Sequence, residues 1–302
     1  MKPSKYKHPP WLNASKRQPT EAAVSPWVEV ESRKWLLTRD VDDNHSLPCQ
    51  ASVRTWIDLG GFTIRSNQGL HFHCDMAPPQ HRETRWLRIE NGCVQLDHES
   101  AAVSIRSYAH VELHNVVVKN IADVVTSMYT PPVLSFDACA FAQLTSVSVR
   151  RASAVRTRNY CLVEVSGGCQ GLVRKGGVSI YDCTFSAAQQ ASLEIVGLGL
   201  ARLRCVRICR LTLEHLHGTR VTGIKLSACS NCIVDLVALL HSRALCVLQG
   251  LRFESQCLHC ALFENQVDLS SCSGESSACV CSPRSQVYDS STTVLDSERQ
   301  CL

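Results

Sequence analysis

The stretch TWIDLGGFTIRS, residues 55–66, carries the local signal that decides the fold. The apolar pairs I-x-L and F-x-I flank two glycines, Gly60 and Gly61. Alternation with a period of two is typical of a strand, whereas glycine inside a strand marks a bend or a close backbone approach. The stretch therefore predicts two short strands, one with Ile57 and Leu59 and one with Phe62 and Ile64, joined at a glycine corner.

The same pattern of strand, corner and strand recurs along the chain as an internal repeat. Each unit begins with an apolar-x-apolar triplet, passes through a corner of small or polar residues, and continues into a second alternating stretch. The starts are 31, 29, 30, 31 and 27 residues apart and lie at Val103, Leu134, Val163, Leu193, Ile224 and Leu251. A period in this range is typical of a solenoid, a propeller or a helical array.

Strand length and proline distribution separate these architectures. The apolar runs are too short for helical repeats, and a unit of about 30 residues is too short for a four-stranded propeller blade. Between Pro132 and Pro283 the chain has no proline, which suits a continuous hydrogen-bonded sheet. The repeat predicts an all-β fold, a right-handed parallel β-helix with coils of about 30 residues.

Three segments carry a family resemblance. WIDLGGFTI from Trp56, WLRIENGCVQL from Trp86 and VSIRSYAHVELHNVVVKNI from Val103 resemble the opening coils of right-handed parallel β-helix proteins of the pectate-lyase-like superfamily. The resemblance covers about residues 50–270. It implies the fold rather than one activity, because the superfamily includes lyases, hydrolases, epimerases, phage tailspikes and proteins without catalysis.

Composition divides the chain into three expected parts. Residues 1–49 form a basic, proline-rich arm, residues 50–269 form the β-helix, and residues 270–302 form a Ser/Cys-rich tail that we expect to be disordered. A net charge of +4 does not indicate a nucleic-acid partner, and no aromatic and basic platform for bases is recognisable. The first 20 residues show no apolar secretion signal, so the compartment stays open.

The most apolar late stretch is not expected to span a membrane. IVDLVALLHSRALCVLQGL contains Asp235, His241 and Arg243, which are costly inside a bilayer. We expect no membrane span. An oligomer remains possible.

Polar residues that follow the second strand of each unit could form a stripe down one face of the β-helix. The expected catalytic residues in this stripe are Asp182, His241 and Arg210. The expected substrate-binding residues are Arg150, Arg151, Tyr181, Asn120 and Lys119. Arginine binds carboxylates bidentately and histidine or aspartate can move protons, so the stripe predicts contact with an acidic polysaccharide. The alternative is a solvated ladder of alternating charges.

Enzymatic activity stays open at this point. The motifs of the known polysaccharide-cleaving members are missing: the only Asp-Asp pair, Asp42–Asp43, precedes the repeats, and no acidic cluster for calcium is recognisable. The protein is therefore expected either to bind or cleave an acidic polysaccharide, as a lyase or glycoside hydrolase, or to be a structural or interaction solenoid such as a virion or surface component.

Two CxxC pairs offer the one cofactor hypothesis. Cys229, Cys232, Cys257 and Cys260 have the spacing of two zinc knuckles, so zinc is a candidate cofactor. The repeat itself produces equal spacing, and Cys139, Cys169, Cys229 and Cys257 fall at equivalent corners. Buried packing of free thiols and disulfide formation are therefore the alternatives.

Overall fold

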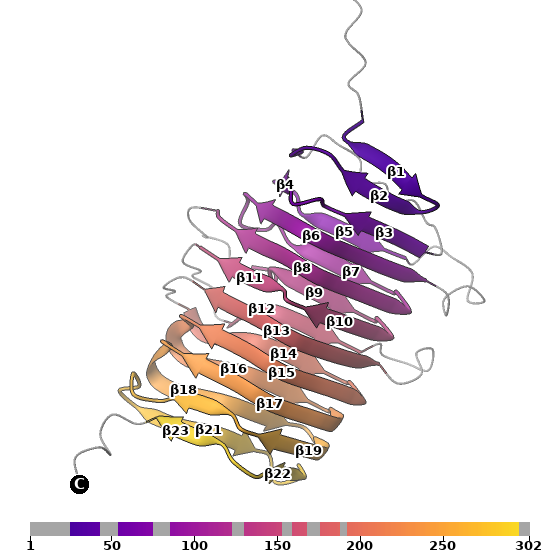
Figure 1. The fold of residues 1–302 in the computed structure, drawn as a ribbon. Coiled ribbons are helices and arrows are strands. Elements are labelled where there is room, and N and C mark those ends of the chain that lie inside the picture. The colour runs from indigo at the N-terminus through magenta and orange to yellow at the C-terminus, as the bar shows by residue number, and fades with distance from the viewer. Residues whose placement is uncertain are drawn as a thin grey trace, which may run out of the picture.

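We describe the protein from a computed structural model, which covers residues 25–42, 54–74, 85–122, 130–152, 159–167, 176–187 and 192–295. These residues contain strands, turns and bends but no helix, and they wind into a parallel β-solenoid of about 7 turns with coils of about 28 residues (Figure 1). The predicted parallel β-helix is therefore confirmed, with coils slightly shorter than expected. The described residues accordingly offer no apolar helix of the length needed to cross a lipid bilayer.

The larger sheet, which we call sheet A, has 15 strands. Its strands in spatial order are β1 (Trp27–Glu31), β2 (Lys34–Leu37), β3 (Arg54–Asp58), β6 (Trp86–Leu96), β8 (His110–Asn120), β10 (Phe141–Thr145), β13 (Gly177–Ala187), β15 (Cys205–Glu214), β17 (Ser230–Leu240), β19 (Leu258–Phe263) and β22 (Val287–Asp289). Beside this path lie β4 (Thr63–Ser66), β11 (Ser148–Arg151), β20 (Gln266–Asp268) and β23 (Thr293–Leu295).

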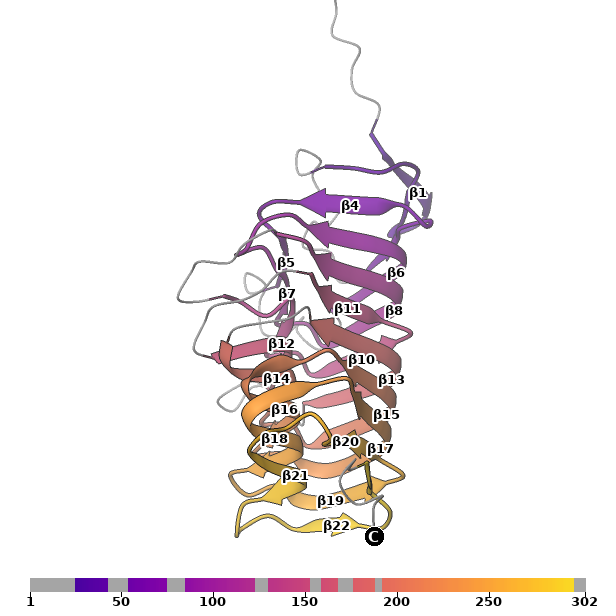
Figure 2. The ribbon, with the colours of Figure 1, turned by 90° about the vertical axis from the view of Figure 1, so that its left-hand side faces the viewer.

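The smaller sheet, sheet B, has 8 strands. In chain order they are β5 (Leu70–His73), β7 (Val103–Arg106), β9 (Leu134–Asp137), β12 (Asn159–Ser166), β14 (Ser192–Ala201), β16 (His217–Ser227), β18 (Arg243–Glu254) and β21 (Glu275–Cys281). Each strand pairs in parallel with its equivalents in the neighbouring coils, and Figure 2 shows the two sheets as separate walls of the coil stack.

The core between the walls is a stack of apolar side chains. Ile57, Leu59 and Ile64 are 1 %, 0 % and 5 % exposed, whereas Phe62 is 36 % exposed and lies in the corner rather than in the second strand. Gly60 and Gly61 adopt left-handed φ angles of 58° and 85°, so the predicted glycine corner is confirmed. A Cβ on Gly60 would meet the Leu37 carbonyl oxygen at 2.8 Å, while one on Gly61 would meet nothing within 4 Å.

Sheet A bends along a column of left-handed residues. One residue of this kind stands at the equivalent position of successive coils, with φ between 46° and 57°: Asn91, Asn115, Ser146, Asp182, Arg210, Leu236 and Glu264. Asn and Asp tolerate this conformation better than most residues. At this residue a long strand such as β8 or β13 changes direction, and its parallel pairing with the neighbouring coils continues on both sides of the bend.

Both ends of the chain contain more structure than the sequence suggested. β1 and β2 form an antiparallel pair within the expected arm, and β21, β22 and β23 form parallel ladders within the expected tail. Residues 270–295 thus differ from a disordered tail. The physical reason is that a parallel ladder is held by backbone hydrogen bonds to the preceding coil, which serine does not prevent, while Cys279 and Val287 pack against the core.

Candidate binding surface on the first coils

The predicted stripe does not form one column. Asn120 pairs in register with Arg151, which pairs with Ala187, and the next coils continue this column with His215 and His241. Asp182 and Arg210 lie five residues earlier, in the bend of sheet A. Asp182 and Arg151 therefore belong to different columns. The neighbour of Asp182 in the preceding coil is Ser146.

Asp182 and Arg210 form an exposed ion pair with each other. Arg210 donates from Nε to Asp182 Oδ1 at 2.5 Å and from its second guanidinium nitrogen to Oδ2 at 2.9 Å. This bidentate contact lowers the pKa of the Asp182 carboxyl below its usual range. The carboxylate therefore stays charged and engaged, which is the opposite of what a general acid requires.

Two of the predicted substrate-binding residues are buried and serve the fold. The Arg151 guanidinium donates to the Tyr160 hydroxyl at 3.2 Å and to the Glu99 carbonyl at 3.3 Å, and only 1 % of Arg151 is exposed. The Asn120 amide donates to the carbonyls of His98 and Ala101 at 3.0 and 3.2 Å. Both side chains hold the turn after Leu96 in place.

The other predicted residues lie at separate places. The rings of His241 and His215 stack with centroids 5.6 Å apart. Lys119 and Arg150 are register neighbours on β8 and β11, and Tyr181 lies between Thr145 and Cys209 on sheet A. Among the described residues, no hydrogen bond, ion pair or ring contact joins Asp182, His241 and Arg150 to one another.

The four cysteines of the zinc hypothesis are buried. Cys229 and Cys257 lie at successive corners, whereas Cys232 and Cys260 are register partners within β17 and β19. Cys229 donates its thiol to the Leu200 carbonyl at 3.5 Å, and Cys257 donates to the Leu226 carbonyl at 3.5 Å. Cys139 makes the same contact with the Ile105 carbonyl at 3.7 Å, whereas Cys169 lies outside the described residues. These bonds support packing of free thiols. The described part of the chain contains no group of three or more His, Cys, Asp or Glu arranged to hold a metal.

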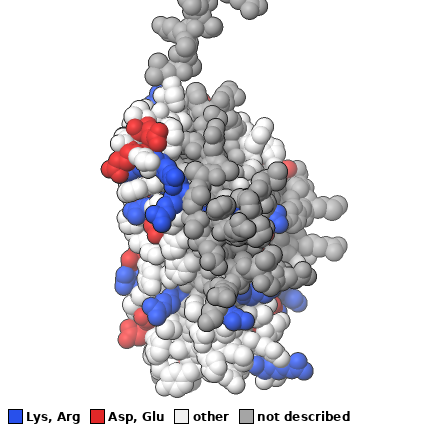
Figure 3. Space-filling view, turned by 90° about the vertical axis from the view of Figure 1, so that its right-hand side faces the viewer, with Lys and Arg blue, Asp and Glu red and all other residues white. Residues whose placement is uncertain are grey.

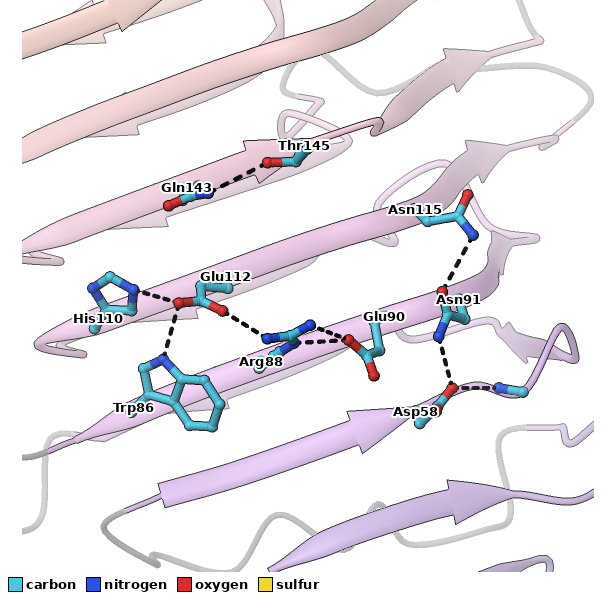
Figure 4. Close-up of polar contacts among 11 residues, drawn as sticks. Asp58, Trp86, Arg88, Glu90, Asn91, His110, Glu112, Asn115, Gln143 and Thr145 are labelled. Atoms are coloured by element: carbon cyan, nitrogen blue, oxygen red, sulfur yellow. Dashed lines mark hydrogen bonds and ion pairs between the residues drawn. The ribbon is translucent and has the colours of Figure 1, made fainter.

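The structure gathers a different set of side chains on the outer face of sheet A, over its first coils. We call this the Trp–Arg–Glu surface, and Figure 4 shows most of it. Register places Trp56, Arg88 and Glu112 side by side on β3, β6 and β8. The full set is Lys34, Trp56, Trp86, Arg88, Glu90, His110 and Glu112.

Aromatic rings and cations alternate in this surface. The Trp56 and Trp86 rings meet edge to face with centroids 6.4 Å apart. Lys34 places its ammonium 3.8 Å from the centroid of the Trp56 ring, and Arg88 places its guanidinium carbon 4.7 Å from it. Cations at these distances are attracted by the negative face of the indole, which fixes both rings and charges in position.

The two carboxylates of the surface are fully engaged. Glu112 accepts hydrogen bonds from Trp86 Nε1 at 3.4 Å and from Arg88 at 3.4 Å, and His110 Nε2 lies 2.8 Å from it. Arg88 also contacts Glu90 at 2.6 Å, and only 5 % of Glu90 is exposed. The network is therefore rigid, and its acids serve to hold Arg88 and the Trp86 ring.

A hollow of about 250 Å³ opens beside the two tryptophan rings. Three cations line it, Arg33, Lys34 and Arg54, against one acid, Glu31. Figure 3 shows acidic and basic side chains gathered near the N-terminal end of the molecule, with further basic side chains spaced toward the C-terminal end. The hollow thus combines aromatic walls with a local excess of positive charge.

A short amide ladder fixes the backbone next to this surface. Asn115 donates to Asn91 at 3.2 Å, and Asn91 donates to Asp58 at 3.3 Å. Asp58 also accepts from the amide of Gly60 at 3.0 Å (Figure 4). The ladder joins three coils at the bend of sheet A, so the strands that carry the tryptophans cannot move independently.

Sequence reasoning missed this surface. We expected no platform of aromatic and basic residues. The sequence did contain one signal for this surface. Successive side chains of a strand point to opposite faces, so Trp56, which precedes the inward Ile57, must point outward. Comparisons with family models, with curated proteins and with solved structures give no match for this chain.

Proposed function

We propose that the protein is a carbohydrate-binding β-solenoid that holds an acidic saccharide at the Trp–Arg–Glu surface. The observation that carries the proposal is the hollow in which two tryptophan rings stand beside three cations. A sugar ring presents an apolar face that packs on the Trp86 indole, because Lys34 and Arg88 already stack on the Trp56 ring. A uronic-acid carboxylate is matched by the guanidinium fork of Arg33. Lys34 and Arg88, held by their contacts with Trp56, keep the site preorganised.

Binding is favoured over cleavage by the state of the carboxylates. Glycoside hydrolysis usually needs two carboxyl groups, one of them free to donate a proton. Here Glu90 and Glu112 are both bonded to Arg88, and Asp182 is bonded to Arg210. The proposal therefore assigns the protein a lectin-like role. Membership of the pectate-lyase-like superfamily belongs to the same proposal and rests on the sequence motifs together with the solenoid.

A structural or interaction solenoid is the second candidate function. The outer face of sheet A carries exposed apolar side chains over its last coils, with Ile233 41 %, Leu236 40 % and Tyr288 65 % exposed. Exposed apolar residues of this kind can mark a contact with another protein. This candidate predicts no saccharide binding and an assembly that depends on the C-terminal coils.

The two candidates are separated by a binding assay with variants at either end. We expect titration calorimetry to show binding of oligogalacturonate and no binding of a neutral oligosaccharide of equal length. Trp56→Ala and Arg33→Asn should each weaken binding by about tenfold or more, since the first removes the ring that positions Lys34 and Arg88 and the second removes a charge-assisted contact. Asn is chosen because Arg33 has a φ of 72°, which Asn tolerates.

Tyr288→Ala provides the matched control, because it removes an exposed aromatic ring at the far end of the same sheet. It should leave saccharide binding unchanged. Tight binding of single-stranded oligonucleotides in place of the saccharide would make the surface a nucleic-acid site. Absence of binding, with assembly lost in Tyr288→Ala, would favour the structural solenoid.

A further inference from the structure

Sheet B carries a second cavity, of about 290 Å³, on its outer face over β12, β14 and β16. Its central floor residue is Gly199, which pairs in register with Glu164 of the preceding coil and Lys225 of the following coil. Glu194 and Cys161 also line it. The cavity lies on the other sheet from the Trp–Arg–Glu surface, so the two sites are separate (Figure 2).

The absence of a side chain at Gly199 is what makes the hollow. Its neighbours in the same outward column carry long side chains, Glu164 before it and Lys225 after it. A Cβ added at Gly199 would meet the Cys161 sulfur at 2.9 Å, closer than van der Waals contact permits. Any larger residue would therefore fill the cavity or displace the Cys161 thiol.

The charge of this cavity is negative. Glu164 and Glu194 place two carboxylates against a single lining cation, Lys225. Lys225 contacts Glu254 outside the cavity at 3.3 Å, and Arg252 lies 2.7 Å from Glu254 but 3.7 Å from Glu194. Arg252 therefore bridges Glu194 and Glu254. Three carboxylates, those of Glu164, Glu194 and Glu254, face the two cations Lys225 and Arg252, so the group keeps a net negative charge.

Two further side chains define what the cavity can do. Thr130 lines it and is 5 % exposed, and its hydroxyl has no hydrogen-bond partner within the described part of the chain. A buried hydroxyl left without a partner is costly, so it indicates a group to be bound. Burial, with the carboxylate of Glu164 as a smaller cause, raises the pKa of Cys161 to about 12. The thiol is thus protonated at neutral pH and does not act as a nucleophile.

We infer that this cavity binds a small hydroxylated primary amine, with the ammonium group held by Glu164 and Glu194 and a hydroxyl near Thr130. Its volume lies at the lower limit of about 300–1,000 Å³ for small-molecule sites, which suits a ligand of monosaccharide size. An ammonium group compensates the net negative charge of these side chains directly, whereas an uncharged ligand of the same size does not. This site is independent of the proposed saccharide surface.

The test compares glucosamine with glucose, its uncharged match in size, and with N-acetylglucosamine, which is uncharged and larger by an acetyl group. Calorimetry or ligand-observed NMR should show binding of glucosamine at neutral pH and at least tenfold weaker binding of glucose and N-acetylglucosamine. Glu164→Gln should reduce glucosamine affinity by about tenfold or more, because a charge-assisted hydrogen bond is lost while shape is kept. Gly199→Ala should reduce it further by filling the floor.

Glu214→Gln on sheet A is the control and should leave glucosamine affinity unchanged, as should Trp56→Ala. The inference is overturned by glucosamine that fails to bind at millimolar concentration, by equal binding of N-acetylglucosamine, or by affinity that Glu164→Gln does not reduce. Each of these results leaves oligogalacturonate binding at the Trp–Arg–Glu surface as a separate question. A misfolded Gly199→Ala variant does not affect the test with Glu164→Gln.

Discussion

The two adjacent glycines of the first corner should respond very differently to the same substitution. Gly60 and Gly61 both have positive φ, so an alanine at either position costs about 1–2 kcal/mol of left-handed strain. At Gly60 the new Cβ also meets the Leu37 carbonyl oxygen at 2.8 Å and the Leu36 side chain at 3.2 Å. Overpacking of this kind adds about 1–3 kcal/mol.

We therefore expect Gly60→Ala to lower the free energy of unfolding of the first coils by about 2–5 kcal/mol and Gly61→Ala by about 1–2 kcal/mol. Reduction of unfolded-state entropy by alanine is common to both variants and cancels in the difference. The carbonyl of Leu37 belongs to β2, so the strain should fall on the pairing of β2 with β3.

Tryptophan fluorescence in urea measures these coils directly. All five tryptophans lie in the first 86 residues, at positions 11, 27, 35, 56 and 86. Hydrogen exchange of the Trp56 amide, which donates to the Arg33 carbonyl at 3.0 Å, gives a second readout. Equal destabilisation by the two alanines, or a larger effect at Gly61, would show that contact with Leu37 does not limit the corner.

Two further predictions concern charge and thiols. Arg210→Gln should raise the pKa of Asp182 to the ordinary range, which a carboxyl NMR titration measures. Because the paired carboxyl has a lowered pKa, the ion pair stabilises the folded state at neutral pH. This stabilisation is lost as the pH falls through the lowered pKa. An unchanged Asp182 titration would contradict the bidentate pair. Cys229→Ala should cost about 1 kcal/mol, as for loss of a small buried group, and protein purified without chelator should contain no stoichiometric zinc by elemental analysis. One zinc per chain that disappears in Cys229→Ala would support the knuckle hypothesis instead.

The fold could be predicted because each coil repeats the same inward alternation. Ile57, Leu59 and Ile64 obey it, and the glycine corner follows from it. Such a signal survives changes in coil length, because burial depends on parity within one strand and not on exact alignment between coils. The family resemblance adds the same conclusion from short motifs.

The site could not be predicted because it depends on alignment between coils. Arg151 follows the bend residue Ser146 by five positions, whereas Asp182 is itself the bend residue of the next coil. When the coils are aligned by their apolar triplets alone, the column that contains Arg151 and the bend column that contains Asp182 are read as one. The Trp–Arg–Glu surface requires in addition that β2, from the expected arm, pairs with β3. Nothing in the repeat period indicates that pairing.

The strands along the solenoid are uneven in length, and the last coils have the shortest ones. Near the middle β13, β15 and β17 contain 11, 10 and 11 residues, whereas β22 and β23 in the last coil contain 3 each. In a stack where each coil touches only its neighbours, stability is close to a sum of local terms. Under tension the last coil should therefore detach first. During synthesis the strongly paired coils leave the ribosome earlier, and each completed one offers its edge as a template for the next.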